Sequence, residues 1–82
     1  DFAIAKYFSL LDLGFSDNQM RIAIVKDEKL NIHHAVLVVY LNGQSLVLDN
    51  QNKNIRNSTA ISYYKPIFSI NGNAWWMHET SS

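Results

Sequence analysis

The stretch that decides the fold is His34-Ala-Val-Leu-Val-Val-Tyr-Leu41, followed by Asn42-Gly43 and then by Gln44-Ser-Leu-Val-Leu-Asp49. Two runs of apolar and β-branched residues flank Asn-Gly, which is the strongest short-range signal for a β-hairpin. The sequence therefore predicts two antiparallel strands joined by a two-residue turn. A histidine stands near the start of the first strand, and an aspartate stands near the end of the second.

The length of the turn decides which residues face one another. With a two-residue turn, Leu41 pairs with Gln44, and the same register places Asp49 opposite Val36. Residues directly opposite share a face of the sheet, as do residues two apart on one strand. We therefore expect His34 and Asp49 on one face as diagonal neighbours, roughly 7–8 Å apart at the backbone. A three-residue turn would put the two side chains on opposite faces.

A histidine beside a carboxylate is the arrangement of the general base and its orienting group in a catalytic triad. From the spacing alone, His34 could instead be a structural histidine at a strand end, and Asp49 could be a turn residue that caps the strand. The chain contains no cysteine, and no serine lies in a recognisable nucleophile motif. The sequence therefore contains two parts of such a site without the group that attacks.

Composition indicates one small globular domain. Of the 82 residues, 48% are hydrophobic, and seven basic residues balance seven acidic ones. Without a basic patch, nucleic acid and anionic membrane surfaces are not expected as partners, and no apolar run is long enough to span a membrane. The absence of cysteine excludes a disulfide or a thiolate metal site within the chain. The adjacent residues His33 and His34 would point to opposite faces of a strand, so they do not suit one metal ion.

The first segment of the chain reads as a helix that ends near Gly14. Asp1 is suited to cap its first free amides, and glycine suits its C-terminal end. Only three residues between these positions are polar, and they form one narrow stripe: Lys6, Ser9 and Asp12. We therefore expect the helix to be buried on most sides.

Further strands are expected at Met20–Lys26, at Ile67–Ile70 and, at the end, at Ala74–Met77. A charged loop covers 27–31, and 50–62 reads as a loop with some extended structure. Pro66 favours an edge position for the strand that follows it. The predicted fold class is α+β, with one buried N-terminal helix packed on a mainly antiparallel sheet of four to five strands.

Four segments, taken together, resemble the bacterial transglutaminase-like cysteine proteinases. They are Asp1–Leu10, Met20–Val25, His34–Leu37 and Leu46–Asn50, and the resemblance extends from Asp1 to about Trp76. It implies a core like that of papain and transglutaminase. In this family a cysteine at the start of the helix is the nucleophile, a strand histidine is the general base, and an aspartate on the next strand orients it.

The resemblance assigns the base to His34 and the orienting carboxylate to Asp49. The family's cysteine lies in a Cys-Glu-Asp segment whose last residue matches Asp1, so the nucleophile would lie two positions before residue 1. Residues 1–82 would then be a single domain that is the C-terminal part of a larger proteinase domain, inactive alone. Because the chain opens directly into a helix, we expect a fragment that exposes apolar surface and self-associates.

The resemblance also implies an exported, periplasmic enzyme with a protein substrate, and an activity that can depend on calcium. Asp1 is the candidate calcium ligand in this chain. Because calcium takes six to eight oxygen ligands, the chain alone is not expected to hold a cofactor. Two alternatives remain open: a non-catalytic relative that binds protein segments in a leftover cleft, and a small structural or interaction domain without a site.

Overall fold

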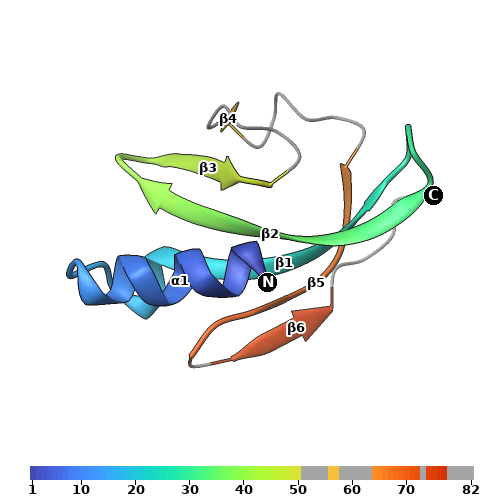
Figure 1. Ribbon diagram of the computed structural model, residues 1–82. Coiled ribbons are helices and arrows are strands. Elements are labelled where there is room, and N and C mark those ends of the chain that lie inside the picture. Colours follow the sequence, from blue (N-terminus) through green and yellow to red (C-terminus); the bar gives the residue numbers. More distant parts are fainter. Residues whose placement is uncertain (51–55, 58–63, 73, 78–82) are drawn as a thin grey trace.

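The computed structural model of the protein describes residues 1–50, 56–57, 64–72 and 74–77. Helix α1 (Phe2–Asp12) is followed by a 3-10 turn, η1 (Asp17–Gln19). The strands of the described chain are β1 (Met20–Asp27), β2 (Ile32–Leu41), β3 (Gln44–Leu48), β4 (Arg56–Asn57), β5 (Tyr64–Ile70) and β6 (Trp75–Met77). Figure 1 shows α1 lying along one face of the sheet. In the described ranges, no helix combines the length and the apolar character needed to cross a membrane.

The strands form one antiparallel sheet in the order β4-β3-β2-β1-β5-β6. This confirms the α+β class with one helix on a sheet. The described sheet has six strands rather than four to five, because two residues of the expected loop region pair with β3 as β4. The two longest strands, β1 and β2, occupy the centre of the sheet. A central position is expected for β2, because the side chains on both of its faces are apolar.

The hairpin of β2 and β3 has the predicted two-residue turn. Asn42 and Gly43 both adopt positive φ, 51° and 77°, which is the backbone that Asn-Gly favours in a tight hairpin turn. Leu41 pairs with Gln44, and Leu37 pairs with Leu48 further along. The predicted register is therefore confirmed.

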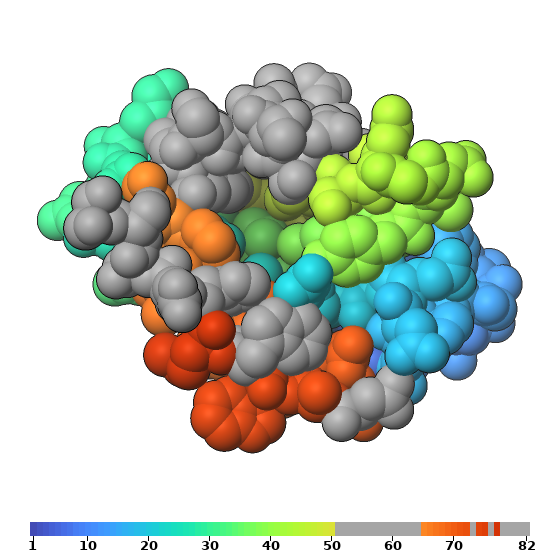
Figure 2. All heavy atoms as spheres, turned by 180° about the vertical axis from the view of Figure 1, so that it is seen from behind, coloured from blue at the N-terminus to red at the C-terminus, as the bar shows by residue number. Residues whose placement is uncertain are grey.

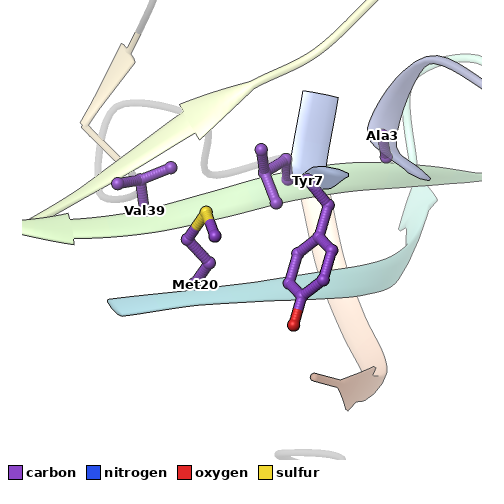
Figure 3. Packing of buried hydrophobic residues seen from close by; sticks show 5 residues of the cluster. Ala3, Tyr7, Met20 and Val39 are labelled. Atoms are coloured by element: carbon purple, nitrogen blue, oxygen red, sulfur yellow. The ribbon is translucent and has the colours of Figure 1, made fainter. Parts of the chain in front are cut away.

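Helix α1 packs on the sheet through a narrow stripe. Asp1 caps the helix, since its side chain accepts a hydrogen bond from the backbone N–H of Ile4 at 3.2 Å. Ala3 and Tyr7 are the buried residues of α1, and they join an apolar cluster with three strand residues, shown in part in Figure 3: Met20, Leu37 and Val39. We call this side of the sheet the helix face.

The expectation that α1 is buried on most sides is wrong. Phe8 is 58% exposed and Leu13 is 76% exposed, and Ile4 is also exposed. The reason is geometric: a helix on a single sheet buries only the side that meets the sheet, and among the described residues nothing packs on the other side. The apolar surface that a fragment was expected to expose is therefore present.

The opposite side of the sheet, which we call the rear face, has an apolar cluster of its own. Its buried members are Ala23, Val25, Val36 and Val47. These residues alternate along the strands with those that meet α1, as the two-residue period of a strand requires. Figure 2 views the molecule from behind Figure 1, and parts of the central strands, in cyan to green, are visible on this side.

Pro66 does not lie on an edge strand, because β5 pairs with β1 on one side and with β6 on the other. The register between β1 and β5 shifts from Ile24↔Phe68 to Val25↔Pro66, so Ile67 is an extra residue on β5. A β-bulge of this kind accommodates a proline that could not continue a regular ladder. The strand also begins before the proline, at Tyr64.

A hydrogen-bonded cluster fixes α1 to two turns of the chain. The Tyr7 hydroxyl donates to Asp17 Oδ1 and accepts the backbone N–H of Gly72 at 3.0 Å. A Cβ atom at Gly72 would lie 2.6 Å from Asp17 Oδ2, so any other residue there would force the Asp17 side chain to move. Asn71, next to Gly72, donates from Nδ2 to the backbone oxygen of Asp17 at 3.3 Å. The cluster therefore joins α1 to η1 and to the β5–β6 turn.

Candidate active site

His34 and Asp49 come together at one end of the β2–β3 hairpin. His34 is the third residue of β2, and Asp49 directly follows the last residue of β3. The His34 Nδ1 atom lies 3.5 Å from Asp49 Oδ1. The pair expected from turn length and strand parity is thus in contact. The separation is longer than the 2.6–3.2 Å of a tight catalytic hydrogen bond, but catalytic bonds are often longer in the absence of substrate.

The surroundings of the pair suit an oriented imidazole. The side chain of His34 retains 15% of its exposure, and that of Asp49 retains 1%. A buried carboxylate needs partners that donate to it, and an imidazole Nδ1–H is such a donor. An acceptor that fixes Nδ1–H determines the tautomer and leaves proton exchange to Nε2. This is the role of the orienting aspartate in a triad.

Strand alternation places the pair on the rear face. His34 pairs with Val25 across β1–β2, and both lie on the side that carries Val36 and Val47. Helix α1 packs on the other side, against Leu37. The His34–Asp49 pair and α1 therefore lie on opposite faces of the sheet.

Along the strand direction, the start of α1 does lie toward the histidine. In Figure 1, α1 and β2 run in the same direction. Figure 3 shows Ala3 over an earlier part of β2 than Tyr7, while Val39 lies further along the strand. The first turn of α1 is therefore nearer to the half of β2 that contains His34. A side chain that precedes α1 would therefore lie at the His34 end of the sheet. It would have to extend around the edge of the sheet to reach the rear face.

Asp1 is exposed and serves α1 as its N-cap. A calcium ion takes six to eight oxygen ligands, and Asp1 supplies one carboxylate. Among the residues that the structure describes, no group of three or more His, Cys, Asp or Glu side chains could hold a metal ion. The described residues therefore do not fit a calcium site by themselves.

One carboxylate near the pair was not singled out from the sequence. Asp27 was expected in a charged loop, but it is the last residue of β1 and is 3% exposed. Its Oδ1 atom accepts the backbone N–H groups of Lys29 at 2.9 Å and Leu30 at 3.1 Å. The sequence does contain a signal for this role, because Asp27 begins a short polar connection. An aspartate at such a position commonly accepts the backbone N–H of the residue two positions later.

Comparison with known proteins identifies the fold and its class. The chain matches the family of bacterial transglutaminase-like cysteine proteinases (BTLCP) over residues 1–81. The structure of EGTA-treated LapG from Legionella pneumophila is similar with a TM-score of 0.90 and 36% identity, covering 100% of this chain and 45% of that one. Calcium-bound LapG gives a TM-score of 0.89 and 34% identity, covering 100% and 46%. No curated protein matches the chain.

The fold and the histidine–aspartate contact thus occur in a chain with the architecture of a cysteine proteinase. The protein belongs to the bacterial transglutaminase-like cysteine proteinase family. The chain spans less than half the length of the LapG structures that it matches.

Proposed function

We propose that His34 is the general base and Asp49 the orienting carboxylate of a cysteine peptidase whose thiol is supplied by a residue preceding Asp1 in a longer protein. The observation that carries the proposal is the contact between His34 Nδ1 and Asp49 Oδ1 at 3.5 Å, in a chain of this family. Because the 82 residues contain no cysteine, the chain alone is inactive.

The chemistry assigns one nitrogen of the imidazole to each partner. Asp49 holds Nδ1–H, and Nε2 takes the proton of the thiol. The thiolate then attacks the carbonyl carbon of the peptide bond, and the amine leaves with the proton from Nε2. A water molecule next attacks the thioester and gives its proton to Nε2, so that the carboxylic acid and the thiol are released. A helix N-terminus and a nearby imidazolium both lower the pKa of such a thiol.

Peptide hydrolysis by the longer protein tests the proposal without knowledge of the substrate. The protein is incubated with a proteome-derived peptide mixture, and new termini are identified by mass spectrometry. We expect cleavage by the longer protein, a loss of roughly 10²–10⁴-fold in His34→Ala, and none by residues 1–82. Undiminished cleavage by a folded His34→Ala variant would overturn the assignment.

The same proposal extends to calcium, location and substrate. The solved LapG structures include a calcium-bound and an EGTA-treated form, which supports a calcium dependence in this protein too. Asp1 would then be one ligand, with the remaining oxygens from residues that precede it. The family also favours an exported, periplasmic enzyme that cleaves a protein. Addition of EGTA to the longer protein should abolish cleavage, and calcium should restore it.

One observation favours a second candidate, a non-catalytic relative that binds protein segments. It is the absence of cysteine from the chain. The residue two positions before Asp1 in the gene product separates the two candidates. A cysteine there supports the peptidase, and any other residue supports the binding protein.

A further inference from the structure

The turn between β1 and β2 is held by a buried carboxylate. Asp27 and Ile32 form the last pair of the β1–β2 ladder, and residues 28–31 connect them. Asp27 Oδ1 accepts two backbone N–H groups of this connection, at 2.9 and 3.1 Å. Asn31, just before β2, has a φ of 56°, in the left-handed region. Such a backbone persists where its surroundings hold it, and the Asp27 side chain supplies bonds that do so.

The same turn sets the position of His34. The ladder runs from Asp27↔Ile32 to Val25↔His34, so the histidine stands only two residues beyond the turn. At this point β2 has passed the end of the described β3 ladder, whose last pair is Leu37↔Leu48. In the described residues, the β2 segment around His34 is therefore paired with β1. This β1–β2 ladder ends at the turn that Asp27 caps.

We propose that Asp27 is a positioning residue for His34: its carboxylate caps the β1–β2 turn and thereby holds the imidazole against Asp49. The inference rests on the proposed function of that pair. Asp27 acts through the backbone of the turn, because its Oδ1 atom accepts the N–H groups of Lys29 and Leu30. A cap that only added stability would leave the state of the His34 ring unchanged in every folded variant.

The tautomer of His34 distinguishes these roles. The test uses the longer protein labelled with ¹⁵N-histidine, and two-bond ¹H–¹⁵N correlations report which ring nitrogen carries the proton. In the unmodified protein we expect Nδ1–H, which Asp49 accepts. In Asp27→Ala we expect a change to mostly Nε2–H, the form that free imidazoles prefer. Urea unfolding of each variant shows that it is folded under the conditions of the measurement.

Two further substitutions keep the test decisive if Asp27→Ala does not fold. Asp27→Asn keeps an oxygen acceptor for the turn and removes the charge, so it should retain the Nδ1–H form. Asp27→Ser caps more weakly and should give a mixture of both tautomers. Glu28→Ala alters an exposed residue of the same turn and is the matched control. In this variant, the His34 imidazole should have the same tautomer as in the unmodified protein.

The outcomes separate the inference from the proposed function. If His34 of the unmodified protein is not in the Nδ1–H form, the assignment of the His34–Asp49 pair fails. If it is in that form and remains so in folded Asp27→Ala or Asp27→Ser, the positioning role of Asp27 alone is overturned. Loss of the Nδ1–H form in Asp27→Asn would also overturn it, because the charge and not the turn would then control the ring.

Discussion

The two faces of the sheet use the same strands for different purposes. On the helix face, Met20, Leu37 and Val39 pack with Ala3 and Tyr7 of α1 in a mainly apolar interior. On the rear face, Ala23, Val25, Val36 and Val47 form an apolar cluster. The His34–Asp49 pair lies on the same face, with His34 before Val36 along β2. Because neighbouring residues of a strand point to opposite sides, adjacent positions can serve stability and chemistry separately.

This comparison predicts that substitutions on the two faces have different consequences. A change on the helix face should reduce the free energy of unfolding with little effect on the His34–Asp49 contact. A change at that contact should alter activity far more than stability.

The largest effect on stability is expected for Leu37→Ala on the helix face. Leu37 is fully buried, with 0% exposure, so the substitution removes apolar contacts and leaves a cavity. The free energy of unfolding should fall by about 2–5 kcal/mol, measured by urea titration. A loss below about 1 kcal/mol would mean that this face is not tightly packed.

Tyr7→Phe should have the next largest effect. It removes the hydroxyl that donates to Asp17 and accepts from Gly72, and it leaves those two groups without this partner. We expect a loss of about 1–3 kcal/mol in the free energy of unfolding. Phe15→Leu changes a half-buried residue that packs against the apolar cluster containing Tyr7, and it is a control that keeps the hydroxyl. An unchanged stability of Tyr7→Phe would contradict the role of the hydrogen-bonded cluster.

The same tyrosine makes stability depend on alkaline pH. Burial, and next the hydrogen bond to Asp17, raise the pKa of Tyr7 above its ordinary value. The folded state therefore binds the phenolic proton more tightly than the unfolded state does. The protonated Tyr7 therefore adds to the free energy of unfolding below about pH 10, and this stabilisation is lost as the pH rises through the folded-state pKa. Urea titrations at successive pH values should show a steeper alkaline loss for the unmodified protein than for Tyr7→Phe.

Asp49→Asn tests the rear face. Asparagine retains an oxygen that can accept from His34, so the loss of stability should be only about 0.5–1.5 kcal/mol. The loss of the negative charge beside the imidazole should reduce peptide hydrolysis by the longer protein roughly 10²–10⁴-fold. If stability fell by as much as in Leu37→Ala while activity persisted, the division between the faces would be wrong.

The smallest effect on stability is expected for Phe8→Ser on the outer side of α1. Phe8 is 58% exposed, so the free energy of unfolding should change by less than about 0.5 kcal/mol. We propose that this exposed side drives self-association of the 82-residue chain. Light scattering should show oligomers for the unmodified chain and fewer for the variant. A clean monomer at high concentration for both would contradict the proposal.

Much of the fold could be predicted where the controlling interactions are local. Asn42-Gly43 determined the turn, the turn determined the register, and the register brought His34 and Asp49 to one face. Asp1 was correctly predicted as the N-cap because a cap depends on residues three positions away. In each case the relevant chemistry lies within one hairpin or one helical turn.

The errors concern contacts between distant segments. The edge position of the strand after Pro66 was wrong because β6 pairs with β5 on the side away from β1. The burial of α1 was overestimated because the sequence does not show how many layers cover a helix. The bond between Tyr7 and Asp17 depends on how α1 packs on the sheet, which no local pattern reveals.

The most direct test of the central claim is the pH dependence of thiol alkylation by iodoacetamide in the longer protein. A cysteine before Asp1 that meets the His34–Asp49 pair should react rapidly well below its ordinary pKa of about 8.5, because the imidazolium stabilises the thiolate. His34→Ala should return the reactivity to that of an ordinary thiol. The account is contradicted if the thiol of the unmodified protein already behaves as an ordinary one, or if a folded His34→Ala variant reacts with the same pH profile.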